Sequence, residues 1–210
     1  MQNFQQLKVE IADHIATLTL NSPPVNALTR VLNDELTCAL DCISEMDDVR
    51  VVVLTGEGKV FCAGADLKGR ADNIKGPGDL VAHSRRTREC FHAIRECAKP
   101  VIAAINGAAL GSGLAMAASA DILVVSDKAS LGLPEVDVGL LGGCSHAMRL
   151  FGHSRLRRMA LTGYRDAKGL SVSLIDLRKD EPDVASTFVL ENRFESENRS
   201  HSFNSGIGAD

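Results

Sequence analysis

The chain has 210 residues, of which 45% are hydrophobic, and this composition suits a globular domain with a sizeable apolar core. Its 23 basic and 27 acidic residues give a net charge of −4, so it lacks the positive excess that attracts duplex nucleic acid or an anionic membrane. Aromatic residues make up only 4% of the chain, which argues against a base-stacking surface. We therefore expect neither DNA nor a membrane as a partner.

Predicted strands and helices alternate along the chain. Two segments with alternating hydrophobicity, 6–12 and 14–20, indicate a hairpin, and no basic segment followed by an apolar one precedes them, so we expect a cytoplasmic protein. Helix 29–46 follows, and then strand 50–55, which is apolar on both sides and is expected to be covered on both faces. The later elements are strands 101–105 and 121–125 and helices 80–97, 111–119, 143–151 and 153–162. This alternation predicts the α/β class.

Two features that suggest other classes have simpler explanations. Residues 100–120 carry no charge, but three glycines interrupt them, so a buried strand, a tight loop and a small-residue helix are expected rather than a membrane span. The six cysteines include no C-x-x-C pair, so the sequence predicts no metal site, and we expect reduced thiols.

The composition changes near residue 165. Residues 166–210 contain 9 acidic and 5 basic residues, which accounts for the whole net charge of −4. They offer only two short apolar runs, too little to offset the entropy that ordering costs. We therefore divide the chain into a core, residues 1–165, and an atypical, poorly ordered tail, residues 166–210.

Three segments carry groups suited to catalysis. In 61–68, FCAGADLK, small residues let backbone amides approach a ligand, although a plain strand-to-helix turn explains them equally well. Segment 105–113, INGAALGSG, leads a strand into a helix whose first amides favour negative charge, and it lacks the lysine of a phosphate-binding loop. In 131–143, LGLPEVDVGLLGG, aliphatic neighbours would raise the pKa of Glu135, although a capping or salt-bridged glutamate is the alternative.

In this order, and with KPVIAAINGAALGSG and LTG included, the segments resemble the enoyl-CoA hydratase/isomerase (crotonase) superfamily from about residue 6 to 165. The resemblance implies a crotonase-like spiral of ββα units, whose usual helical C-terminal part is truncated or replaced here. It also implies a homotrimer or hexamer and an acyl-CoA thioester as the substrate. No cofactor beyond the coenzyme A moiety of that substrate is implied, and no metal.

The resemblance also implies roles for matching residues. The backbone amides of Ala65 and Ser112 would form an oxyanion hole for the thioester carbonyl, and the helix that begins near Gly111 would stabilise the enolate. Glu135 would be the catalytic acid and base. The substrate-binding residues that it implies are Ala63, Ala65, Asp66, Lys68 and Gly111.

The sequence departs from the hydratase pattern at Ala115, where hydratases carry the first of two glutamates. With Glu135 as the single carboxylate, we expect double-bond isomerisation or another one-base reaction rather than hydration. Nearby polar residues could compensate, and His146 is the candidate that titrates near neutrality; the others are Asp137, Cys144 and Ser145. The alternative is a catalytically silent family member that binds acyl-CoA or partner subunits.

Overall fold

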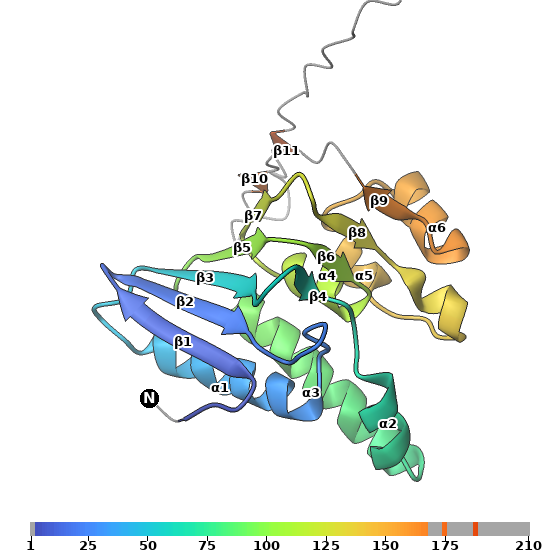
Figure 1. Ribbon diagram of the computed structural model, residues 1–210, viewed down its shortest axis with the longest axis horizontal. Coiled ribbons are helices and arrows are strands. Elements are labelled where there is room, and N and C mark those ends of the chain that lie inside the picture. The colour runs from blue at the N-terminus through green and yellow to red at the C-terminus, as the bar shows by residue number, and fades with distance from the viewer. Residues whose placement is uncertain (1–2, 168–173, 176–186, 189–210) are drawn as a thin grey trace, which may run out of the picture.

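The computed structural model describes residues 3–167, 174–175 and 187–188. Its larger sheet has five strands in the order β1-β2-β3-β5-β7 (Figure 1). β1 and β2 form the predicted antiparallel hairpin, and β2, β3, β5 and β7 are parallel neighbours. The strands are β1 (Leu7–Ala12), β2 (Ile15–Leu20), β3 (Val51–Gly56), β5 (Val101–Ile105) and β7 (Ile122–Val125). Each lies within a residue or so of the predicted range.

A second sheet contains four strands in the order β4-β6-β8-β9, and none of them was predicted. They are β4 (Val60–Cys62), β6 (Ala108–Leu110), β8 (Ser130–Gly132) and β9 (Arg165–Ala167). β4, β6 and β8 are parallel, and β9 is antiparallel to β8. Strands of three residues are too short to show a hydrophobic period, so the segments that hold β4 and β6 look like loops in the sequence. A further short pair joins β10 (Leu174–Ile175) to β11 (Thr187–Phe188).

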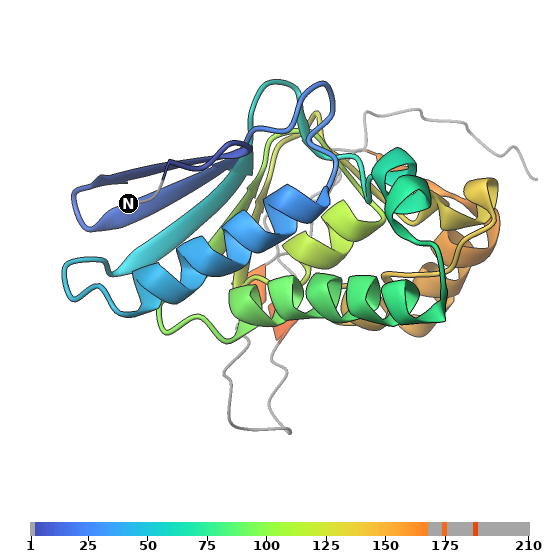
Figure 2. The same ribbon diagram turned by 90° about the horizontal axis from the view of Figure 1, so that it is seen from below.

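Two long helices, α1 (Arg30–Ser44) and α3 (Pro77–Arg95), pack against each other on one face of the larger sheet (Figure 2). The hydroxyl of Thr29 caps α1 by accepting a hydrogen bond from the Leu32 amide at 3.0 Å. The buried face of α1 repeats at helical spacing through its leucines and Ile43. α3 begins three residues before the predicted helix, because proline is well tolerated in a first helical turn.

The shorter helices differ more from the predictions. α4 (Ser112–Ala117) and α6 (His153–Thr162) match predicted helices, whereas α2 (Leu67–Asn73) and the 3-10 helix η1 (Pro134–Val138) were not expected. The helix predicted over 143–151 is wrong in length, because α5 covers only Cys144–Ala147 and turns follow it. Its four residues make it too short to be stable without tertiary packing.

The order of the elements confirms the α/β class and the repeated ββα unit. In three of the units, β3-β4-α3, β5-β6-α4 and β7-β8-α5, the first strand joins the larger sheet and the second joins the smaller one. The predicted poorly ordered tail, residues 166–210, lies almost entirely outside the described residues. The proposed division between core and tail therefore stays a prediction.

Burial in β3 corrects one expectation. Val52 and Leu54 are fully buried, but the alternate residues Val51, Val53 and Thr55 are only half-buried, so the strand is fully covered on one face rather than on both. All six cysteines lie in the described residues and none forms a disulfide there. Among the helices of the described residues, none combines the length and the apolar character needed to cross a bilayer.

Candidate active site

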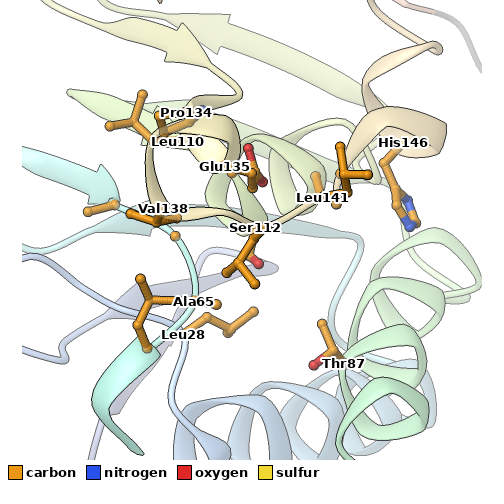
Figure 3. A pocket seen from close by; sticks show the side chains of 18 of the residues that line it. Leu28, Ala65, Thr87, Leu110, Ser112, Pro134, Glu135, Val138, Leu141 and His146 are labelled. Carbon is orange, nitrogen blue, oxygen red and sulfur yellow. The ribbon is translucent and has the colours of Figure 1, made fainter. Parts of the chain in front are cut away.

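A cavity of about 700 Å³ opens between the end of β4, the helices α3 and α4, and the segment from η1 to α5 (Figure 3). Because these elements are far apart in the sequence, the cavity is a product of the tertiary fold. It brings together most of the predicted site residues; those that line it are Ala63, Ala65, Gly111, Ser112, Ala115, Glu135, Asp137, Ser145 and His146.

The amide of Ala65 points away from the neighbouring segment of the chain, which contains Leu28. The Leu28 amide donates to the Gly64 carbonyl at 2.8 Å, and the Leu28 carbonyl accepts from the Asp66 amide at 3.2 Å. These two hydrogen bonds form an isolated parallel bridge between Leu28 and Ala65. Successive amides of an extended segment point to opposite sides. The amide of Ala65 therefore points away from Leu28, and it has no hydrogen-bond acceptor among the described residues.

The amide of Ser112 also lacks a hydrogen-bond acceptor within its helix, because α4 begins at this residue. The first hydrogen bond within the helix runs from the Ala115 amide to the Gly111 carbonyl at 3.0 Å. The first amides of any helix have no partner inside it, and they favour negative charge. Ser112 and Ala65 line the same cavity, so both amides without a protein acceptor belong to residues of one cavity wall.

Glycines bring these two loops together. Gly64 has a φ of +116°, and a Cβ there would lie 3.2 Å from the Leu110 carbonyl oxygen and 4.0 Å from the Ser112 nitrogen. A Cβ on Gly113 would lie only 2.2 Å from the carbonyl oxygen of Cys62. Side chains are therefore excluded between β4 and α4, which explains the small residues in both motifs.

Glu135 lies at the start of η1, directly after Pro134, and its carboxylate approaches the glycine that precedes α4. A Cβ on Gly111 would lie 2.8 Å from Glu135 Oε1, and a Cβ on Gly143 would lie 3.6 Å from the same atom. Oε2 is buried and has no hydrogen-bond partner among the described residues. Burial raises the pKa of Glu135 above its usual range, and a hydrogen bond from its own backbone opposes this shift. A raised pKa makes this carboxyl group a better proton acceptor than an exposed glutamate.

Ala115 also lines the cavity, and its methyl group can neither bind nor transfer a proton. Just after the end of α4, four residues beyond Ala115, the buried hydroxyl of Ser119 donates to the Ala115 carbonyl at 2.9 Å. The same hydroxyl oxygen lies 3.3 Å from Nδ1 of His146. His146 thus enters the cavity wall from α5 through a contact with α4.

Two of the predicted substrate-binding residues lie elsewhere. Asp66 accepts a hydrogen bond from the Gly69 amide at 3.1 Å and so caps α2. It lines a separate cavity of about 190 Å³ that also contains Arg30 and Arg86. Lys68 is exposed on α2 and belongs to the lining of neither of these two cavities within the described residues.

Several lining residues were missed by sequence reasoning. They come from the start of α1, from α3 and from the loop after η1, and they include Leu28, Thr87, Phe91 and Leu141. Apolar residues of a long helix look the same whether they face a core or a cavity, so the sequence held no signal for those of α3. The described residues contain no cluster of histidine, cysteine, aspartate or glutamate that could hold a metal ion.

Comparison with known proteins identifies the family. Residues 10–169 match the family model described as enoyl-CoA hydratase/isomerase, and the chain therefore belongs to this family.

Curated relatives have related names. A (7aS)-7a-methyl-1,5-dioxo-2,3,5,6,7,7a-hexahydro-1H-indene-carboxyl-CoA hydrolase of Rhodococcus jostii is 39% identical over 150 residues, which cover 71% of this chain and 58% of the relative. A probable enoyl-CoA hydratase of Bacillus subtilis is 37% identical over 144 residues, or 69% of this chain and 55% of the relative. The chain thus spans little more than half the length of these curated relatives.

Solved structures share the fold. DspI of Pseudomonas aeruginosa has a TM-score of 0.73 and 35% identity, with 80% of this chain and 69% of that chain covered. An enoyl-CoA hydratase/carnithine racemase from Magnetospirillum magneticum has a TM-score of 0.75 and 27% identity, with 79% and 64% covered. These similarities confirm the crotonase fold that the sequence motifs predicted.

Proposed function

We propose that this protein binds an acyl-CoA thioester and stabilises its enolate, with Glu135 as the group that moves the proton. The observation that carries the proposal is the shared cavity, where the amides of Ala65 and Ser112 lack protein acceptors and the carboxylate of Glu135 is desolvated. Two such amides suit a carbonyl oxygen that gains negative charge. A partly buried carboxylate suits proton removal from the adjacent carbon.

The chemistry follows from these positions. Glu135 removes a proton from the carbon chain of the thioester, and the electron pair of the broken C–H bond moves into the enolate, whose oxygen binds both amides. The proton on Glu135 then returns to a different carbon, and the double bond has moved. This isomerisation needs only one carboxylate, which agrees with alanine at position 115.

The relatives support the substrate class in this proposal. One is named as a hydrolase of a carboxyl-CoA compound and another as a probable enoyl-CoA hydratase, and both names denote work on coenzyme A thioesters. Ala63 and Gly111 line the cavity and would contact the thioester, while Asp66 and Lys68 would act nearer the coenzyme. A cytoplasmic location, a homotrimer or hexamer, and the lack of a cofactor beyond coenzyme A remain proposals.

The test replaces Glu135 with Gln, which keeps the shape of the side chain but cannot accept the proton. We expect isomerisation of 3-hexenoyl-CoA to fall by about 10²–10⁴-fold, the usual contribution of a positioned acid or base. Binding of the saturated analogue hexanoyl-CoA, measured by calorimetry, should persist. Glu89→Gln is the matched control, because Glu89 is exposed on α3 outside the cavity lining. Equal turnover in Glu135→Gln and the wild type would contradict the role of Glu135.

A catalytically silent acyl-CoA-binding protein is the second candidate, and Ala115 is the observation that favours it. The two candidates differ in proton exchange. An enolate-forming enzyme should exchange the α-protons of butyryl-CoA with deuterium oxide, as followed by mass spectrometry. Binding of butyryl-CoA without exchange, and without turnover of enoyl, dienoyl or hydroxyacyl thioesters, would support the silent alternative.

A further inference from the structure

His146 is a half-buried imidazole that the reaction proposed above does not use. It projects from α5 toward α3 and lines the same cavity as Glu135 (Figure 3). Its ring packs edge-on against Phe91 of α3, with 4.8 Å between the ring centroids and 70° between the ring planes. Packing on one side and the contact to Ser119 on the other hold the ring in one orientation.

The hydrogen bonds around Ser119 decide which ring nitrogen carries the proton. A serine hydroxyl has one hydrogen, and that of Ser119 is donated to the Ala115 carbonyl at 2.9 Å. The hydroxyl oxygen can then only accept from His146 Nδ1, at 3.3 Å. With the hydroxyl hydrogen donated in this way, the neutral ring carries its hydrogen on Nδ1 and its basic lone pair on Nε2.

Nε2 is left for a ligand or water. It makes no hydrogen bond within the described part of the chain, and it is not among the buried polar atoms without a partner there. It is therefore accessible to solvent on a side chain that lines the cavity.

The surroundings keep this imidazole neutral. Burial lowers the pKa of His146 below its usual value, and the positive charge of Arg149 and then those of Arg95 and His92 on α3 lower it further. A neutral imidazole at neutral pH is the form that accepts a proton. The other titratable residues that line this cavity are His83, Arg88, Glu135, Asp137 and Arg165, and Cys144 lies beside them on α5.

His146 is held on the helix face where this chain has Ala115 and hydratases have a glutamate. Residues 115 and 119 are one turn apart and share a face of the helix segment, and the imidazole is anchored to that face. A carboxylate at position 115 would project from the same face. His146 therefore brings a titratable side chain to the helix face that carries the methyl group of Ala115.

We propose that Nε2 of His146 accepts a proton from water that adds to an enoyl-CoA thioester, an inference that rests on the function proposed above. The water oxygen bonds to the β-carbon, its proton moves to Nε2, and the π electrons of the double bond become the enolate. The carboxyl group of Glu135 then protonates the α-carbon. His146 loses its proton to solvent and Glu135 regains one, so one water is added overall.

The test compares His146→Gln with the wild type in two assays. Hydration of crotonyl-CoA should fall by about 10²–10³-fold in the variant, as for loss of a general base. Exchange of the α-protons of butyryl-CoA, which uses Glu135, should change less than about twofold by the same reasoning. The matched control is His153→Gln, since His153 is exposed at the start of α6 outside the cavity lining.

Two further measurements separate a chemical role from a structural one. In the wild type, the hydration rate should fall as the pH drops through the lowered pKa of His146, and Ser119→Ala should shift this limb because Nδ1 loses its acceptor. Retained α-proton exchange shows that either variant is folded.

Each result bears on a distinct claim. Wild-type hydration rates in His146→Gln would overturn the inference, and so would a wild-type protein that exchanges α-protons but adds no water. Absence of exchange in the wild type would instead contradict the proposed function, and this inference with it.

Discussion

The two sheets of this protein contrast in how they form and in what they do. Strands of four to six residues build the larger sheet, and their buried side chains form much of the core. Strands of three residues build the smaller sheet, and the loops that leave them carry Ala65, Ser112 and Glu135. The larger sheet therefore supplies stability through burial, whereas the smaller sheet supplies the geometry of the cavity.

This contrast teaches where the protein tolerates change. A core strand responds to lost volume, because burial is roughly proportional to apolar area. The junction between β4 and α4 responds to added volume, since glycines there face backbone atoms at short range. Substitutions in the two sheets should therefore differ in how they divide between unfolding free energy and turnover.

The largest effect on stability is expected from Leu18→Ala in β2, where the side chain is fully buried. The free energy of unfolding should fall by about 2–5 kcal/mol, as for other buried leucines. Turnover per folded molecule should be unchanged, because Leu18 is outside the cavity lining. Urea unfolding and rate assays on the same samples measure both, with the exposed Val81→Ala on α3 as control. Loss of turnover without loss of stability would break the comparison.

Gly113→Ala should disturb the smaller sheet by forcing β4 and α4 apart at the Cys62 carbonyl. We expect an unfolding free energy lower by about 1–3 kcal/mol, typical of overpacking. Turnover should fall further, by about 10²-fold, because the proposed oxyanion hole draws its two amides, from Ala65 and Ser112, from the two segments that are forced apart. Gly78→Ala is the control, since a Cβ there meets nothing within 4 Å. Equal effects of the two alanines would show that the close approach is unimportant.

Asn106→Ala should weaken the connection between the sheets. The side-chain amide of Asn106 donates from Nδ2 to the Gly56 and Gly58 carbonyls at 2.8 and 2.9 Å. These bonds fix the turn between β3 and β4. Loss of these bonds should cost about 1 kcal/mol of unfolding free energy. Amide hydrogen exchange should increase more in 56–62 than in the hairpin of β1 and β2. Uniform exchange across both segments would argue against a local effect.

The smallest expected effect on stability, that of Glu135→Gln, is a gain rather than a loss. The pKa of Glu135 is raised in the folded protein, so its ionised form opposes folding above the pKa of the unfolded chain, and the penalty is complete above the folded pKa. Glu135→Gln should therefore raise the melting temperature slightly at neutral pH, and the difference should vanish near pH ~4, where the unfolded carboxyl titrates. A variant less stable than the wild type at neutral pH would show that the carboxylate is well accommodated.

Long periodic elements were accessible from the sequence, and short ones were not. The apolar face of α1 and the β-branched run of β3 carry their own pattern, so both were predicted within two residues. The 3-10 helix that holds Glu135 and the short α5 have no such pattern. Motifs pointed to Glu135 and Ser112 as site residues, but the positions of Thr87 and Phe91 on the cavity wall required the packing of α3.

The residue types and their spacing along the chain determined the family and the absence of a carboxylate at Ala115, and the ββα order followed only from the resemblance to that family. The tertiary structure decided that Ala65, Ser112 and Glu135 line one cavity, and that Asp66 caps a helix beside it. It also brought His146 to the hydroxyl of Ser119, which lies 27 residues away in the chain. Contacts between distant segments set the direction of amides and the solvation of side chains, and no local pattern encodes them.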